Sequence, residues 1–187
     1  MKWYESIKGV LGCRIDKVCI LSPSISFTDW LRSQQESIED VSIMEGHKKD
    51  VKYFLETIKV FGELEIKMNP YESNFSLEIP EGPTHLHIHT SEFINYDQLL
   101  RLKAQFIYLD ESFLTNQEIN RFLESWMSCE SHLDLKFFKI NIYGMEAVNK
   151  IMNLPHEVIT DGYKIRRCDG KEATVRIFWR SMRLLTH

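Results

Sequence analysis

A pair of apolar residues separated by a single residue recurs along the chain, each time in a short strand-like run that precedes a helix-like run. The pairs are Val18 and Ile20, Val41 and Ile43, Leu64 and Ile66, Leu86 and Ile88, Ile107 and Leu109, and Ile140 and Ile142. Their first members lie at positions 18, 41, 64, 86, 107 and 140, which gives steps of 23, 23, 22, 21 and 33 residues. Steps of about 20–29 residues are typical of leucine-rich repeats, in which each unit is one strand and one helical or irregular return.

Alternation within each run predicts a strand with one buried face and one exposed face. Successive side chains of a strand point to opposite faces, so the paired apolar residues face the core and the residue between them faces outward. We therefore expect an α/β fold in which strand-plus-helix units stack in a leucine-rich-repeat-like manner into a mainly parallel, curved sheet. One domain would span residues 1–187, with strands near residues 18–20, 41–43, 64–66, 86–88, 107–109 and 138–142.

The segments between the strands carry signals for helix starts and for helical packing. Thr115 and Glu118 have the spacing of a capping box, and Asn95 and Ser26 offer similar N-caps. Apolar stripes at helical spacing follow in three segments: Val51, Phe54, Leu55 and Ile58; Tyr96, Leu99, Leu100 and Leu102; and Ile119, Phe122, Leu123 and Trp126. A stripe with a 3.6-residue period predicts a helix that packs against the sheet.

Two segments depart from the repeating pattern. Between Asn69 and Pro83, prolines and a glycine interrupt the run, which predicts an irregular return. Residues 163–179 alternate on both sides of Asp169-Gly170, where glycine supplies the positive φ of a tight turn. We expect a β-hairpin there that closes the end of the stack.

The net charge indicates which classes of partner to expect, and the cysteine spacing indicates the cellular compartment. The net charge is −4 with both signs interspersed, so we expect neither nucleic acid nor an anionic membrane as a partner. No apolar stretch approaches the roughly 20 residues of a membrane span, and the start lacks the pattern of a signal peptide. The four cysteines show no CxxC pair, which argues against a zinc knuckle and a disulfide framework and favours the cytosol or nucleus.

The sequence contains no common catalytic motif, and one histidine-rich segment is a candidate metal site. We find no glycine-rich phosphate loop, HExxH or GxSxG motif, and we expect neither catalysis nor a cofactor. His85, His87 and His89 share one side of a strand, so the alternative is a small metal-dependent hydrolase. The Cα atoms of residues 85 and 89 lie about 13 Å apart on an extended strand, which favours three histidines on an exposed face.

The outward positions of the strands form two lines across the sheet. One line holds Cys19, Ser42, Glu65, His87, Tyr108 and Lys139, and the other holds Leu21, Met44, Lys67, His89, Asp110 and Asn141. The open face of a repeat stack is a common binding surface, and aromatic or long amphipathic side chains are typical anchors. We expect a protein target to contact Met44, Glu65, Lys67, His87, His89, Tyr108, Asp110, Lys139 and Asn141.

Several runs in the second half of the chain resemble a known family. They are residues 99–103, 107–109 and 114–126, followed by 131–133, 138–142, 154–158, 165–167 and 169–175. These runs resemble the nematode F-box-associated type 2 domain, most strongly from Gln98 to Val175. The resemblance implies capture of a target protein for a cullin-based SCF ubiquitin ligase, in which an F-box docks a Skp-type adaptor. About sixteen residues precede the first expected strand, too few for an F-box, so we do not expect adaptor docking.

Overall fold

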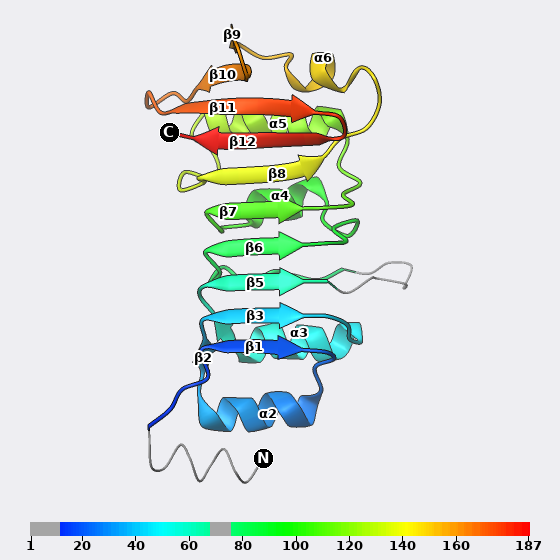
Figure 1. Cartoon of the computed structure of the whole chain (residues 1–187), viewed down its shortest axis with the longest axis vertical. Helices are drawn as coiled ribbons and strands as arrows, with labels where there is room; N and C mark the ends of the chain where they lie inside the picture. Colours follow the sequence, from blue (N-terminus) through cyan, green and yellow to red (C-terminus); the bar gives the residue numbers. More distant parts are fainter. Residues whose placement is uncertain (1–11, 68–75) are drawn as a thin grey trace.

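The computed structural model describes residues 12–67 and 76–187, and its main feature is one ten-stranded sheet. Its first six strands are parallel: β1 (Lys17–Ile20), β3 (Asp40–Ile43), β5 (Glu63–Ile66), β6 (His85–Ile88), β7 (Phe106–Leu109) and β8 (Phe137–Asn141). Four antiparallel strands continue the sheet from β8 in the order β12 (Ser181–Thr186), β11 (Glu172–Phe178), β10 (Gly162–Arg166) and β9 (Glu157–Ile159). The expectation of a large, mainly parallel α/β sheet is confirmed, and Figure 1 shows its strands stacked along the long axis.

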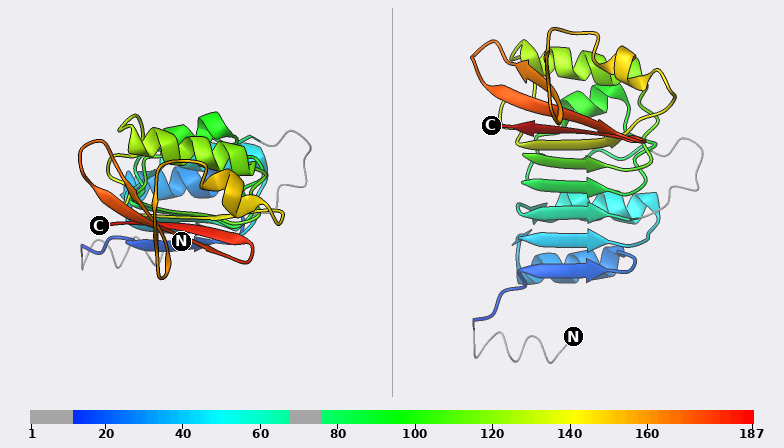
Figure 2. Two further views of the ribbon diagram at one scale, coloured as in Figure 1. Left: turned by 90° about the horizontal axis from the view of Figure 1, so that it is seen from above. Right: turned by 45° about the horizontal axis from the view of Figure 1, so that its top comes forward.

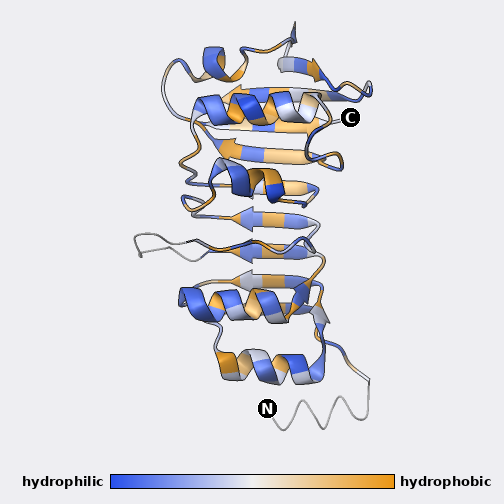
Figure 3. Ribbon diagram, turned by 180° about the vertical axis from the view of Figure 1, so that it is seen from behind, coloured by the Kyte–Doolittle hydropathy of each residue, from blue (hydrophilic) through white to orange (hydrophobic). Residues whose placement is uncertain are grey.

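Within residues 12–67 and 76–187, helices lie on one face of this sheet and leave the other face open. They are α2 (Ile25–Gln34), α3 (Lys48–Thr57), α4 (Tyr96–Arg101), α5 (Asn116–Met127) and the short α6 (Ala147–Ile151). A separate two-stranded sheet, β2 (Ser37–Ile38) and β4 (Lys59–Val60), joins the first two returns. Seen from above in Figure 2, α2 to α5 lie on the same side of the strands, and Figure 3 shows them in front when the molecule is seen from behind.

The core fills the space between the sheet and the helices. The apolar pairs from β3 to β7 are all buried, with exposed fractions of 0–1%, whereas Val18 on the edge strand β1 is half-buried. The apolar stripe of α5, which was expected from its spacing, is fully buried at Ile119, Phe122, Leu123 and Trp126. Burial of each large apolar side chain stabilises the fold by about 1.5–3 kcal/mol, so this layer holds the helices on the sheet.

Helix starts follow the expected chemistry at two of three positions. Thr115 and Asn95 each form a capping box, with Glu118 and Gln98 respectively. The expected N-cap at Ser26 is wrong, because the N-cap lies two residues earlier, at Ser24, whose hydroxyl accepts the Phe27 N–H at 3.3 Å. Ser24, Ser26 and Thr28 alternate here, so several hydroxyls compete for the same role in the sequence.

The C-terminal hairpin is present, but it does not close the stack by itself. β10 and β11 are antiparallel, and Gly170 in the turn between them has φ +92°. The final strand β12 was not expected; it inserts between β11 and β8 and pairs antiparallel with both. The strand that meets the parallel sheet is therefore the last one in the chain, and the hairpin lies one strand further out.

Cys129 and Cys168 form a disulfide, contrary to the expectation from cysteine spacing. They lie 39 residues apart in sequence, at the end of α5 and just after β10. The fold brings these segments together, since the Cys168 N–H donates to the Met127 carbonyl at 2.7 Å. Cysteine spacing therefore gives no argument here for a reducing compartment.

The region expected to be an irregular return lies partly outside the described residues. Of residues 69–83, the structure describes 76–83, which form no helix or strand. Within residues 12–67 and 76–187, no helix has both the length and the apolar character of a membrane span.

Candidate functional site: the open face of the sheet

The strand register brings the outward side chains of neighbouring strands side by side. Cys19, Ser42, Glu65, His87, Tyr108 and Lys139 occupy successive paired positions from β1 to β8. The antiparallel strand β12 extends this row by Arg183, which pairs with Lys139. Neighbouring strands are about 4.8 Å apart, so these side chains lie within reach of one another.

A second row lies two residues further along each strand and holds the other expected contact residues. Backbone hydrogen bonds from Met44, Lys67, His89 and Asp110 to the preceding strands continue the parallel pairing there. Asn141, at the end of the row, is engaged within the fold: its amide donates to the Ser112 carbonyl at 3.1 Å and accepts the Ser112 N–H. Eight of the nine expected contact residues lie on β5 to β8 or directly after one of these strands, and Met44 directly follows β3.

Glu65 is held by three groups from three strands. Its carboxylate accepts the Ser42 hydroxyl at 2.8 Å and lies 3.0 Å from His89 Nε2 and 3.1 Å from Lys67 Nζ. Burial raises the pKa of Glu65, but the hydrogen bonds from His89, Ser42 and Lys67 outweigh it and lower the pKa to about 2. Glu65 therefore carries its negative charge throughout the physiological pH range.

Asp110 forms a matching cluster on the other side of the histidines. Its carboxylate lies 2.9 Å from His87 Nε2 and accepts the Lys139 ammonium at 2.8 Å. Burial raises the pKa of Asp110, and the hydrogen bonds from Lys139 and His87 reverse the shift and lower it. Each carboxylate thus lies between a histidine and a lysine.

His85 and His87 lie on β6 and His89 directly follows it, but the three imidazoles do not form one cluster. The His87 and His89 rings stack with centroids 3.9 Å apart, and their nitrogens lie within 4.8 Å of a Glu65 oxygen and of one another. His85 instead stacks on Phe106, with ring centroids 4.3 Å apart and an interplanar angle of 2°. The three-histidine site of the hydrolase alternative is therefore not assembled here, and the structure replaces it by a His87, His89 and Glu65 cluster.

An aromatic ridge that sequence reasoning missed crosses the open face along the N-terminal ends of β6, β7 and β8. His85, Phe106 and Phe137 occupy paired positions on β6, β7 and β8, and Leu185 continues the row on β12. Tyr108 packs beside the ridge, with its ring centroid 5.0 Å from that of Phe137. Phe106 and Phe137 precede Tyr108 and Lys139 by two residues, so strand alternation was the signal that could have found them.

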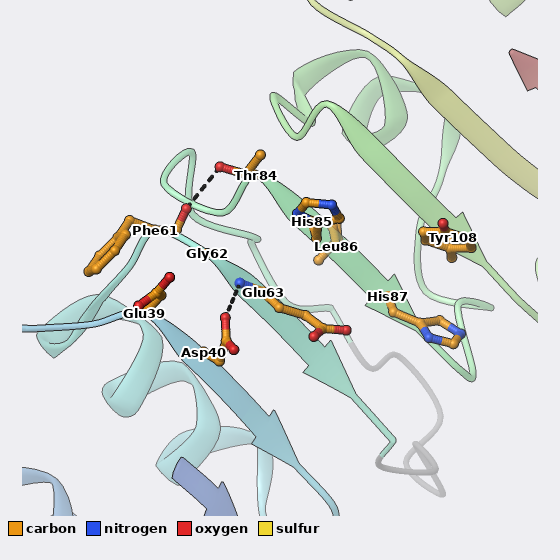
Figure 4. A pocket seen from close by; sticks show the side chains of 10 residues that line it. All are labelled: Glu39, Asp40, Phe61, Gly62, Glu63, Thr84, His85, Leu86, His87 and Tyr108. Atoms are coloured by element: carbon orange, nitrogen blue, oxygen red, sulfur yellow. Dashed lines mark hydrogen bonds between the residues drawn. The ribbon is translucent and has the colours of Figure 1, made fainter. Parts of the chain in front are cut away.

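A pocket of about 590 Å³ opens beside the ridge, at the N-terminal ends of β3, β5 and β6. Figure 4 shows the carboxylates of Glu39, Asp40 and Glu63 along one side and the rings of His85, His87 and Tyr108 along the other. Asp40 Oδ1 accepts the Glu63 N–H at 3.0 Å, and Asp40 Oδ2 lies 3.6 Å from Lys17 Nζ. The pocket therefore combines aromatic walls with negative charge.

The two ends of the ridge carry opposite charges. Glu63 pairs with His85 at the β5 end of the ridge, and Arg183 lies near the β12 end, two residues before Leu185 and in the neighbouring row of Lys139. Both side chains are exposed, and neither takes part in an ion pair within the described part of the chain. The face therefore offers an acidic group and a basic group on opposite sides of an aromatic centre.

Residues 74–140 match the family model described as F-box associated. The match confirms the resemblance over this part of the chain, which includes β6, α4, β7, α5 and most of β8. The three aromatic residues of the ridge, His85, Phe106 and Phe137, thus lie within the matched segment. No curated protein and no solved structure matched the chain.

Proposed function

We propose, from the family match over residues 74–140, that the chain is a non-catalytic protein-recognition module that binds a target protein on the open face of its sheet. Its strand-plus-helix units form a leucine-rich-repeat-like stack in this proposal. The family also supports a role related to F-box proteins, in which target capture serves an SCF-type ubiquitin ligase. The observation that carries the proposal is the aromatic ridge on the sheet face that the helices of the described residues leave uncovered.

Burial of the ridge by a partner supplies the main favourable free energy. His85, Phe106 and Phe137 retain exposed surface that a partner can bury. Burial of aromatic side chains dominates the energetics of many interfaces. Tyrosine and arginine are enriched among residues that dominate interface energies, and the face carries Tyr108 and Arg183. The ion pairs of Glu65 and Asp110 hold the surrounding side chains in fixed positions, which lowers the ordering entropy that binding requires.

The charges define the chemistry of the occupant as an extended segment with a basic side chain, an apolar anchor and an acidic side chain. The basic side chain fits the pocket of Glu39, Asp40 and Glu63, and the acidic side chain fits Arg183. From β5 to β12 the sheet advances by four strand spacings of about 4.8 Å, roughly 19 Å in total. An extended segment covers this distance in about six residues.

The test compares how much partner is retained by variants of the open face and by a control variant of the helix-covered face. Affinity purification would use the wild-type chain, the double variant Tyr108→Ser/Phe137→Ser, and the control Lys52→Ala, whose side chain is 61% exposed on α3. We expect a partner that the wild-type and control chains retain equally and that the double variant loses by at least about tenfold, the weight of one hot-spot residue. Circular dichroism would confirm that each variant is folded.

The partner's own sequence provides the second part of the test. Glu63→Lys should weaken binding, and a compensating basic-to-acidic change in the partner's segment should restore it. Partners recovered equally by the wild-type chain and the double variant would contradict the proposal, as would a bound segment without the basic, apolar and acidic order.

A further inference from the structure

We propose that Glu65, His87 and His89 form a binding site for a divalent transition-metal ion of the zinc class. Within the described residues, these side chains are the group of histidine and acidic residues whose ligand atoms converge, all within 4.8 Å of one another. The proposal is independent of protein binding, since it concerns the cluster alone. It also differs from a three-histidine site, because His85 stacks on Phe106 and lies outside the cluster.

The backbone already places the ligand atoms of the three side chains at separations close to those of a zinc site. Zinc binds histidine nitrogen and carboxylate oxygen at about 2.0–2.2 Å, so ligand atoms of a tetrahedral site lie roughly 3.3 Å apart. His89 Nε2 and Glu65 Oε1 are 3.0 Å apart, so this pair needs almost no change. His87 closes the remaining gap by rotation of its ring, because β5 and β6 hold Glu65 and His87 at paired positions.

The surrounding groups suit a metal ligand set. Two neutral imidazoles and one carboxylate are a common donor set for zinc, which leaves a fourth position for water or another ligand. Asp110, 2.9 Å from His87 Nε2, orients this imidazole in the way that carboxylates orient metal-bound histidines. Lys67 competes with the ion for Glu65 at 3.1 Å, and its half-exposed side chain is free to turn toward solvent when metal binds.

Zinc titration of the full chain by calorimetry tests the site, with Co²⁺ absorption as a report of ligand geometry. We expect one saturable site per chain and visible Co²⁺ bands of tetrahedral coordination. His87→Ala, His89→Ala and Glu65→Gln should each weaken zinc binding by at least about 100-fold, since outer partners alone contribute 10–100-fold. Asp110→Asn should weaken it by about tenfold, and Lys67→Ala should strengthen it.

His85→Ala is the matched control, because His85 lies on the same strand and the same face as His87. It should leave the zinc affinity unchanged, as should Cys19→Ser, which removes the exposed thiol on β1. Circular dichroism would show that the ligand variants are folded. No saturable uptake by the folded chain up to about 1 mM zinc would overturn the proposal. Affinity that survives His87→Ala or disappears in either control would also overturn it.

Discussion

The buried imidazole of His132 should make the stability of this fold depend on pH between 6.5 and about 4. It lies in the loop between α5 and β8, where its ring packs edge-on against Phe122 with centroids 4.9 Å apart. Burial, followed by the nearby charge of Lys103, lowers the pKa of His132 from 6.5 to about 4. The native state therefore keeps this imidazole neutral at pH values at which an unfolded chain would protonate it.

The sign and size of the effect follow from linkage. Because the folded pKa lies below the unfolded one, the contribution of His132 is fully present above pH 6.5 and is lost as the pH falls toward 4. Between pH 7 and pH 5, the free energy of unfolding should fall by about 2 kcal/mol through this residue alone, as pKa values of 6.5 and about 4 require.

Urea unfolding of the wild-type chain and of His132→Asn at pH 7 and pH 5 measures this contribution. Asparagine tolerates the positive φ of 53° at position 132 and does not titrate, so the variant should lose about 2 kcal/mol less than the wild-type chain over this interval. His156→Asn, at an exposed position, should keep the wild-type dependence. An equal pH dependence of His132→Asn and the wild-type chain would show that His132 makes no such contribution.

Three further predictions concern the disulfide, a helix cap and an ion pair. Replacement of Cys129 and Cys168 by serine should lower the free energy of unfolding by about 4 kcal/mol, from the loop entropy of 39 residues, and a urea titration with an unchanged midpoint would contradict this. Thr115→Ala should lower it by about 1 kcal/mol through loss of the capping box, checked by thermal unfolding against Ser33→Ala. Glu65→Gln should remove the part of acid unfolding between pH 4.5 and 2, because the lowered pKa of Glu65 makes its stabilisation vanish as pH falls through that interval.

The parts of the fold that depend on local pattern could be predicted from the sequence. Strand alternation places His87 and Tyr108 on the open face whatever their neighbours are, and the capping box at Thr115 needs only the residue three positions later. The repeat spacing then predicts which strands pair, because each return brings the chain back beside the previous strand. These signals all act over about one repeat.

Features set by contacts between distant segments could not be predicted in this way. β12 joins β8 across some forty residues of chain, so Arg183 and Leu185 had no local signal that placed them on the open face. The Cys129–Cys168 disulfide likewise depends on how α5 meets the end of β10. The orientation of His85 depends on Phe106, which lies on the next strand, and strand alternation does not specify that stacking.

Site-specific photo-crosslinking from the two faces of the folded chain tests most directly whether a protein partner binds the open face of the sheet. A photoreactive phenylalanine would replace Tyr108 on the open face in one protein and Glu56, exposed on α3, in another. We expect the partner to crosslink from position 108 and not from position 56. A partner that crosslinks from position 56 alone, or equally from both positions, would contradict it.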